Sequence, residues 1–364
     1  MALKDTHKSA LHEKKGISPL ENTDPKAVAR FQQLRKRKLS AKTLTERIIK
    51  GDITLLSRAI TYVESTLPAH QELAREVINS CLPYANNSIR IGITGVPGVG
   101  KSTFIESFGN YLTSLGKKVA VLAVDPSSSL SKGSILGDKT RMETLVNNPN
   151  AYIRPSAAGD SLGGVARKTR ETIILCEAAG FDTILIETVG VGQSETAVHS
   201  MVDFFLLLKL AGAGDELQGI KRGIMEMADA IVINKADGKN LEATQRAKVE
   251  FNRALHLFPP KKNGWVPKVL TASAIENKGI DVIWELIRLF IEQQNSTGFF
   301  TKNRVQQQKY WLWQTIEERL KAAFYEHPEI QKNMPIELEA LELNKTTPFA
   351  AAQRLLELYK PIIE

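Results

Sequence analysis

The segment from Gly95 to Thr103 has residue types and a spacing that suit the binding of phosphate groups. It fits the pattern G-x-x-x-x-G-K-[ST] without a mismatch. Glycines allow backbone N–H groups to close around phosphate oxygens, and a helix that follows adds the positive potential of its N-terminus. We expect Lys101 to reach the β- and γ-phosphates of a nucleotide and Ser102 to bind Mg²⁺. The predicted phosphate-binding residues are Gly95, Val96, Pro97, Gly98, Val99, Gly100, Lys101, Ser102 and Thr103.

Three acidic residues are candidates for the same site. Asp125 and Glu187 each end an apolar run that is typical of a strand, and Asp138 lies in a predicted loop. Ligands of open α/β sheets bind beyond the carboxyl ends of the strands, so we expect these acids near Mg²⁺ and the γ-phosphate. Mg²⁺ takes few carboxylates and keeps several waters, so one or two of them would act through water. Ion pairing with nearby lysine and arginine residues is the alternative interpretation, and it is stronger for Asp138.

Two further candidates, both later in the sequence than Glu187, could act on the γ-phosphate and on water. Gly190 is a candidate for a backbone N–H that meets the γ-phosphate, and Gln193 could orient the attacking water. The sequence shows neither an evident catalytic base nor an arginine that could complete the site, so we expect slow hydrolysis without a partner. The predicted catalytic group is therefore Lys101, Asp125, Asp138, Glu187 and Gln193, with Ser102 added as a metal ligand.

A second motif, Asn234 to Asp237, follows another predicted strand and suits a guanine base. The Asp237 carboxylate can accept from the guanine N1 and N2 hydrogens, and adenine has no such pair of donors. Asn234 can orient the loop, and the alkyl stem of Lys235 can cover the base. After the next strand, backbone N–H groups near Ser273, Ala274 and Ile275 could meet the guanine O6. The motif favours guanine over adenine because it lies downstream of the phosphate-binding segment.

A polar, glycine-rich segment from Leu210 to Gly223 follows the apolar run 204–208. Its glycines permit large backbone changes, and polar residues such as Gln218 and Lys221 offer contacts that can be exchanged. We interpret it as a switch that changes between ordered and disordered states, with a plain surface loop as the alternative.

Elements that could position these residues alternate along the chain. Helical patterns separate most of the predicted strands, which indicates an α/β fold with a mostly parallel sheet flanked by helices, the fold of a P-loop NTPase domain. The predicted strands are 90–95, 118–124, 183–187, 204–208, 230–234 and 266–271. We divide the chain into a basic arm (1–40), an N-terminal helical region (41–87), a GTP-binding domain (88–292) and a C-terminal helical arm (293–364).

Composition limits the other classes of function. The sequence has no run of about 18 apolar residues, so we expect no membrane span. The N-terminus lacks the apolar region of a secretory signal. The two cysteines, Cys81 and Cys176, are far apart, which favours reduced thiols and a cytoplasmic protein. Residues 1–50 hold 13 Lys and Arg against 5 Asp and Glu, which accounts for the whole net charge of +8. No nucleic-acid module accompanies this charge, so we expect a solvated arm and no nucleic-acid partner.

Taken together, the motifs resemble one family of proteins, the MeaB/ArgK-type G proteins. These are GTPase chaperones of adenosylcobalamin-dependent methylmalonyl-CoA mutase. The resemblance covers about residues 40–364. It rests on Gly95–Phe104, Val124–Ser128, Gly137–Met142, Ser161–Glu171, Ile186–Glu195, Leu210–Lys221 and Asn234–Asp237. Glu187 begins a motif that an aspartate begins in Ras-like proteins.

The resemblance implies GTP and GDP as ligands with Mg²⁺, and a slow GTPase activity. It matches Asp125, Asp138 and Glu187 to acids associated with Mg²⁺ and hydrolysis, and Asp237 with Ser273 and Ala274 to the guanine site. It implies a homodimer formed through the C-terminal arm and a mutase partner, with isobutyryl- or ethylmalonyl-CoA mutase as alternative clients. It matches the segment from Leu210 to Gly223 to the family's third switch, and we expect Gln218 and Lys221 in this segment to relay the nucleotide state to the mutase.

Three other functions compete with this one. A kinase or ATPase linked to amino-acid transport is a label that relatives of this family have carried, and the guanine motif argues against ATP. A nickel-delivery GTPase would need a cluster of soft ligands, which six scattered histidines and two distant cysteines do not make. A nucleic-acid binder would depend on the basic arm alone.

Overall fold

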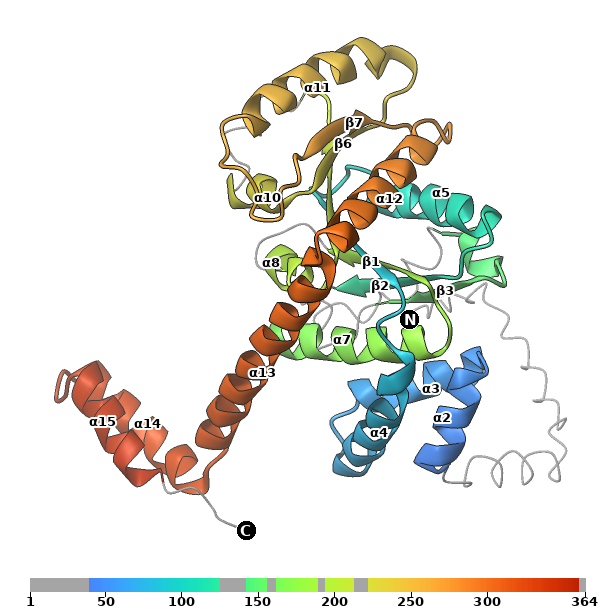
Figure 1. Ribbon diagram of the computed structural model, residues 1–364. Helices are drawn as coiled ribbons and strands as arrows, with labels where there is room; N and C mark the ends of the chain where they lie inside the picture. The colour runs from blue at the N-terminus through green and yellow to red at the C-terminus, as the bar shows by residue number, and fades with distance from the viewer. Residues whose placement is uncertain (1–38, 125–141, 156–161, 189–193, 213–221, 360–364) are drawn as a thin grey trace, which may run out of the picture. The chain divides into compact units, whose positions relative to one another are not determined.

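The computed structural model describes residues 39–124, 142–155, 162–188, 194–212 and 222–359. Within these ranges, seven parallel strands form one sheet in the order β3-β2-β4-β1-β5-β6-β7 (Figure 1). The strands are β1 (Ile89–Gly95), β2 (Val119–Val124), β3 (Ala151–Arg154), β4 (Thr183–Thr188), β5 (Phe204–Leu210), β6 (Ala230–Asn234) and β7 (Lys268–Thr271). The prediction of an α/β fold with a parallel sheet is confirmed.

The sequence predicts six of these strands and misses the edge strand β3. This strand has four residues, of which Tyr152 and Ile153 are buried. So short a run carries too little pattern for recognition, whereas the central strands are apolar on both faces. In β5 and β6, for example, nearly every residue is buried.

Helices cover both faces of the sheet. One face packs against α5 (Lys101–Ser114) and α12 (Ile280–Ser296), and the phenylalanines Phe104, Phe108 and Phe290 fill the interface. The other face carries α7 (Leu162–Ala178), α8 (Ser194–His199), α10 (Arg222–Met227) and α11 (Leu241–Leu255) (Figure 1). This burial of both faces explains why the strands read as continuous apolar runs.

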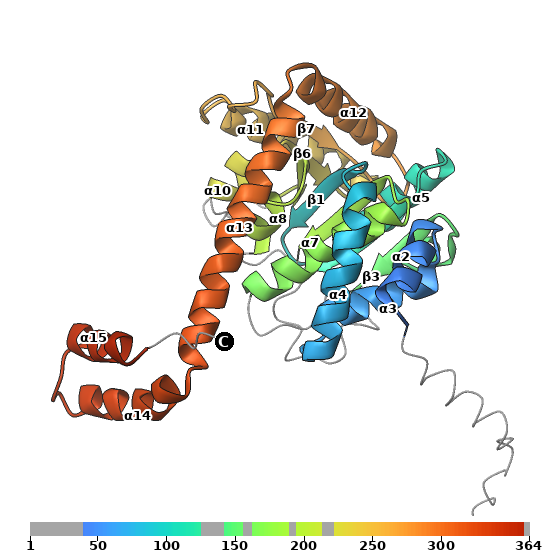
Figure 2. The same ribbon diagram turned by 60° about the horizontal axis from the view of Figure 1, so that its bottom comes forward.

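Between residue 39 and the sheet, the structure has three α-helices, α2 (Ala41–Ile49), α3 (Ile53–Glu64) and α4 (Pro68–Cys81), followed by the short helix η1 (Leu82–Tyr84). The Asp52 carboxylate caps α3 by accepting from the Leu55 N–H at 3.0 Å. The three helices pack against α7 (Figure 2). An ion pair between Glu64 and Arg154 ties α3 to the edge strand β3.

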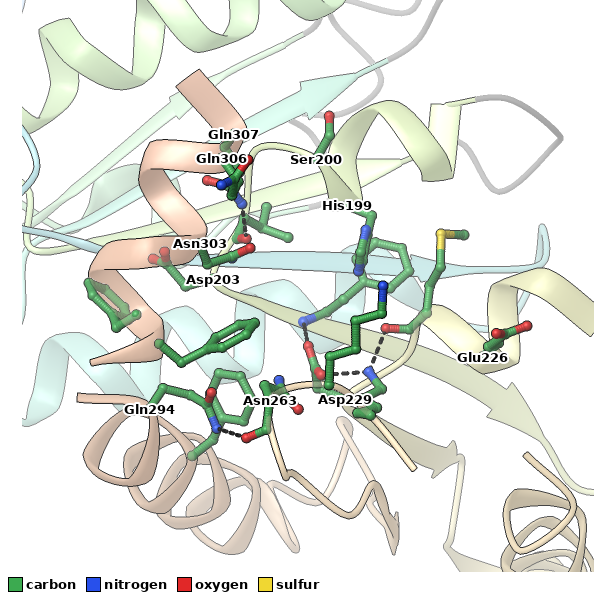
Figure 3. Close-up of a pocket in the computed structure, with 18 of the residues that line it drawn as sticks. His199, Ser200, Asp203, Glu226, Asp229, Asn263, Gln294, Asn303, Gln306 and Gln307 are labelled. Carbon is green, nitrogen blue, oxygen red and sulfur yellow. Dashed lines mark hydrogen bonds and ion pairs between the residues drawn. The ribbon is translucent and has the colours of Figure 1, made fainter. Parts of the chain in front are cut away.

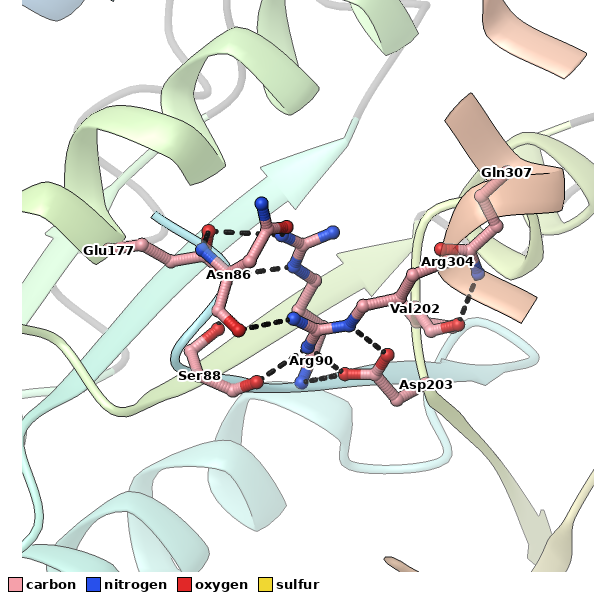
Figure 4. Close-up of polar contacts among 8 residues, drawn as sticks. All are labelled: Asn86, Ser88, Arg90, Glu177, Val202, Asp203, Arg304 and Gln307. Carbon is pink, nitrogen blue, oxygen red and sulfur yellow. Dashed lines mark hydrogen bonds and ion pairs between the residues drawn. The ribbon is translucent and has the colours of Figure 1, made fainter. Parts of the chain in front are cut away.

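The C-terminal helices are α13 (Phe299–Tyr325), α14 (Pro328–Glu342) and α15 (Pro348–Leu358). Arg304 fixes the first part of α13 to the sheet through a buried ion pair, with its Nη2 at 2.7 Å from Asp203 Oδ2 (Figure 4). The same guanidinium donates to the carbonyl oxygens of Asn86 and Ser88 at 2.8 and 2.6 Å. Further along α13, the Trp311 ring lies 3.8 Å from the Arg170 guanidinium of α7. No helix in the described ranges is both long enough and apolar enough to cross a bilayer.

Candidate nucleotide-binding site

The predicted phosphate-binding segment lies between β1 and α5, at the carboxyl edge of the sheet. Gly98 and Gly100 adopt φ values of 81° and 92°, which glycine tolerates and other residues rarely adopt. Gly100 is the N-cap of α5, and no described side chain caps this helix. The first N–H groups of α5 are thus available to an anion, as expected of a phosphate site.

Close packing explains why two positions of this segment are occupied by glycine. A Cβ at Gly95 would lie 2.7 Å from the Leu208 carbonyl oxygen, and one at Gly100 would lie 3.0 Å from Asn234 Nδ2. The loop therefore sits directly against β5 and against the end of β6. This contact brings together two predicted motifs that are far apart in the chain.

Lys101 places a positive charge over the loop. Its Nζ donates to the carbonyl oxygens of Gly95 and Val96 at 2.8 and 3.4 Å. Burial lowers the pKa of Lys101, while the charges of Glu187 and Glu195 raise it in part. A nucleotide's phosphates would supply stronger acceptors than these carbonyls.

Ser102 and Glu187 lie together at the start of α5 and the end of β4. The Ser102 hydroxyl donates to Glu187 Oε1 at 3.5 Å. Because β1 and β4 pair in parallel with Ile93 opposite Glu187, the strand register itself places this carboxylate beside the loop. A buried hydrogen bond of 2.8 Å between Thr188 and Thr94 holds the two strand ends. A hydroxyl and a carboxylate are hard oxygen ligands, so this pair fits Mg²⁺.

The predicted guanine residues converge at the ends of β6 and β7. Ser273 Oγ donates to Asp237 Oδ2 at 2.6 Å, which fixes the carboxylate. Asn234 Nδ2 donates to the Val99 carbonyl at 2.9 Å, and Lys235 Nζ donates to that of Gly98 at 2.9 Å. Asn234 and Lys235 thus connect the base motif to the phosphate loop. In the turn after Ser273, Ala274 is buried and Ile275 is exposed.

Three residues at this site escape the interpretation of the sequence. Glu195 on α8 is 1% exposed and interacts electrostatically with Lys101. Ser107 of α5 donates to Asn277 Oδ1 at 2.6 Å and so ties the guanine-side turn to the phosphate-side helix. No local motif marks Ser107 or Asn277. Only the position of Glu195 shortly after Glu187, within one glycine-rich motif, could have drawn attention to it.

Six predicted residues lie outside the described ranges. They are Asp125, Asp138, Gly190, Gln193, Gln218 and Lys221.

The structure combines a parallel sheet, a glycine-rich loop at the start of a helix, and a base motif on the neighbouring strands. Together these features define a P-loop nucleotide-binding protein. The comparison with known families makes this more specific. Residues 56–329 match the family described as "Methylmalonyl Co-A mutase-associated GTPase MeaB". The chain belongs to this family; it is a GTPase and binds guanine nucleotides.

Similar proteins cover most of the chain. The Escherichia coli protein named "GTPase ArgK" is 45% identical over 311 residues, which are 85% of this chain and 94% of that protein. The mouse protein "Methylmalonic aciduria type A homolog, mitochondrial" is 45% identical, and the match covers 86% of this chain and 78% of that protein. A crystal structure described as "LAO/AO transport system kinase" is 39% identical, with a TM-score of 0.71 over 87% of this chain and 96% of that one.

Proposed function

We propose that this GTPase is a nucleotide-driven chaperone that assists the loading of adenosylcobalamin into an acyl-CoA mutase and protects the enzyme. Methylmalonyl-CoA mutase is the proposed client. The observation that carries the proposal is membership of a family named for its association with that mutase, over 56–329. The names of relatives such as the mouse methylmalonic aciduria type A homolog point the same way.

The site residues have distinct roles in this proposal. Asp237, held by Ser273, would accept from guanine N1 and N2, which gives base selectivity. Lys101 and the N–H groups of α5 would hold the phosphates and stabilise charge as it develops on the leaving group. Ser102 and Glu187 would hold Mg²⁺, with Asp125 and Asp138 proposed as further ligands, direct or through water. When bound, the ion would neutralise phosphate charge.

The same proposal includes an assembly and a location. Exposed apolar residues of α13 and the helices after it are proposed to form a homodimer interface. Gln218 and Lys221 are proposed to relay the nucleotide state to the mutase. The two cysteines are free and buried in the structure, which agrees with a cytoplasmic protein, although the mouse and nematode relatives are named as mitochondrial.

One experiment tests the client. The chain would be tagged at its C-terminus and loaded with GDP or with a non-hydrolysable GTP analogue, and each form would be mixed with purified methylmalonyl-CoA mutase. We expect a complex whose affinity depends on the nucleotide and a mutase that accelerates GTP hydrolysis. Absence of both effects, with normal GDP binding, would contradict the chaperone role.

A second candidate function is a kinase or ATPase linked to amino-acid transport. The specific observation in its favour is the similarity to the crystal structure described as "LAO/AO transport system kinase". The Asp237 carboxylate argues against adenine, because it accepts hydrogen bonds and adenine offers no pair of donors to it; Asn234 and Lys235 of the same motif contact the phosphate loop. A competition experiment decides between the two functions. If ATP displaced bound GDP as effectively as the same concentration of GTP does, the guanine-based proposal would fail.

A further inference from the structure

The turn between β7 and α12 (272–279) orients the carboxylate of the proposed guanine site. Ser273 and Lys278 exchange two backbone hydrogen bonds of 3.0 Å, which close the turn into a short antiparallel bridge. The Ser273 hydroxyl accepts from the Glu276 N–H at 3.2 Å and donates to Asp237 Oδ2 at 2.6 Å. The position of this turn therefore sets the orientation of the Asp237 carboxylate.

Asn277 connects the turn to the helix of the phosphate site. Its φ is 53°, in the left-handed region, which asparagine adopts more readily than most residues with a side chain. Its Oδ1 accepts from the Ser107 hydroxyl of α5 at 2.6 Å. Ser107 is 7% exposed, so the donor of this hydrogen bond is buried, although Asn277 itself is exposed. The residue type at 277 thus suits both the backbone of the turn and the contact with α5.

The base motif is held to the phosphate site by two separate contacts. Asn234 and Lys235 donate to two carbonyls of the phosphate loop, which fixes the end of β6. The hydrogen bond between Ser107 and Asn277 fixes the turn after β7, and its donor lies inside α5, six residues after Lys101. Because the phosphates are expected at the start of α5, one helix joins the phosphate site to the base turn.

Selectivity for guanine depends on the orientation of the Asp237 carboxylate. Guanine has two donors, N1–H and the C2 amino group, and the carboxylate must meet both of them side by side. Hypoxanthine, the base of inosine, has N1–H but no amino group, so it needs only one of these hydrogen bonds. A small rotation of Asp237 therefore weakens the binding of guanine more than that of hypoxanthine. A contact that fixes the turn should accordingly change base selectivity as well as affinity.

We propose that Ser107 is a positioning residue for base recognition, which rests on the guanine site of the proposed function. By donating to Asn277, it holds the turn after β7 in place against the phosphate-binding helix. It thereby sets the selectivity of the site for guanine over hypoxanthine, although it contacts neither the base nor the phosphates itself.

Guanosine and inosine diphosphates measure this selectivity, because they differ only in the C2 amino group. Calorimetric titration of the full-length wild type should show GDP binding at least about tenfold more tightly than inosine diphosphate, as one charge-assisted hydrogen bond predicts. This ratio of affinities should fall about threefold in Ser107→Ala and in Asn277→Gly. Glycine adopts the φ of 53° readily, so Asn277→Gly removes the acceptor and keeps the backbone of the turn.

A double-mutant cycle tests whether the two residues act through one contact. Both substitutions remove the same hydrogen bond, so Ser107→Ala combined with Asn277→Gly should lose no more selectivity than either single variant. Asn277→Asp keeps an acceptor oxygen and tolerates the same φ, so it should keep the wild-type ratio. Additive losses in the cycle, or a loss in Asn277→Asp as large as that in Asn277→Gly, would overturn the proposal.

Two matched controls lie far from the base site. Ser200 donates its hydroxyl to the Ala197 carbonyl at 2.6 Å, as short a bond as that of Ser107, but it precedes β5 and lines a cavity of about 910 Å³ (Figure 3). Asn344 has the same φ of 53° as Asn277 but lies between α14 and α15. Ser200→Ala and Asn344→Gly should leave the affinity ratio unchanged. A similar fall in these controls would refute a specific role of Ser107.

The guanine site and the role of Ser107 fail in different ways. If the wild type binds GDP and inosine diphosphate equally, the proposed guanine site around Asp237 is wrong, and the role of Ser107 fails with it. If the wild type is selective and both Ser107→Ala and Asn277→Gly keep its ratio, the guanine site stands and the role of Ser107 alone is refuted.

Discussion

Asp237 carries the selectivity for the base in the proposed site, and its chemistry makes a specific prediction. In Asp237→Asn, the amide can no longer accept from both guanine donors. Its NH₂ group can instead donate to the C2 carbonyl of xanthine. Two charge-assisted hydrogen bonds contribute about 1.5–3 kcal/mol each, so we expect GDP affinity to fall at least about 100-fold. Xanthosine diphosphate should become the tighter ligand.

Calorimetric titration with both diphosphates measures this exchange. Ser273→Ala is the companion variant, because it removes the hydroxyl that donates to Asp237 Oδ2 but keeps the carboxylate. It should weaken GDP binding without creating affinity for xanthosine diphosphate. Unchanged GDP affinity in Asp237→Asn would remove this residue from the base site.

Glu177 is the carboxylate for which the structure predicts an effect of pH on stability. Its side chain is fully buried, and it receives hydrogen bonds from Arg90, Ser88 and the Asn86 N–H (Figure 4). Burial alone would raise the pKa of Glu177, but the charge and hydrogen bonds of Arg90, with those of Ser88 and Asn86, lower it below its ordinary value. The stabilisation is therefore complete above about pH 4.5 and is lost as the pH falls through the lower folded-state pKa.

We expect Glu177→Gln to reduce the free energy of unfolding by about 3 kcal/mol at pH 7, because it leaves Arg90 without its buried counter-charge. The variant should also lose less stability than the wild type below about pH 4.5. Urea unfolding at several pH values measures both effects. Glu242→Gln is the control, since its ion pair with Arg246 is exposed and should contribute less than about 1 kcal/mol. Parallel pH profiles for wild type and Glu177→Gln would contradict the assignment.

At the scale of elements, the turn between β7 and α12 depends on one glycine. Gly279 is the N-cap of α12 with a φ of 76°, and a Cβ there would lie 2.5 Å from the Thr271 carbonyl oxygen. Gly298 caps α13 with a similar φ of 69°, but a Cβ there would have no atom within 4 Å. The two positions therefore separate backbone strain from a steric clash.

We expect Gly298→Ala to reduce stability by about 1 kcal/mol through strain alone, with normal GDP binding. Gly279→Ala should reduce stability by more than that. It should also weaken GDP binding, because the displaced turn carries Ser273, which orients Asp237. Thermal unfolding and GDP titration of both variants test this comparison. Equal effects of the two substitutions would show that the clash is relieved without moving the turn.

The elements also show what a sequence can and cannot reveal. The phosphate loop and the base motif are predictable because each is a short run of neighbouring residues that follows a strong apolar strand. The pair between Arg304 and Asp203 joins residues 101 positions apart, and neither side chain stands in a recognisable motif. The same holds for Ser107 with Asn277, which meet only after α5 and the turn before α12 have folded. Contacts of this kind are set by packing and not by local pattern.

At the scale of the whole molecule, α13 has two different sides. One side binds the GTPase core. Arg304 pairs with Asp203, and Gln307 donates to the Val202 carbonyl. Trp311 donates to the Ser200 carbonyl and packs against the Arg170 guanidinium. Further along, Trp313 and Leu320 are 62% and 61% exposed. Large exposed apolar side chains on one helix are typical of a protein–protein interface. This arrangement supports the proposal that the C-terminal arm is held by its own core and offers an apolar surface to a second copy of the chain.

We expect the double substitution Trp313→Glu and Leu320→Glu to convert the proposed dimer into a monomer, because two charges would have to be buried at the interface. Loss of two interface anchors should raise the dissociation constant by well over about 100-fold, which sedimentation velocity can measure. Gln308→Glu with Lys309→Gln is the control, since it lowers the net charge by the same amount at polar positions of α13 and should leave the assembly intact. GDP affinity should be normal in both variants, because the core contacts of Arg304 and Trp311 are retained. If the Trp313 and Leu320 variant sediments as the wild type does, this side of α13 does not form the dimer.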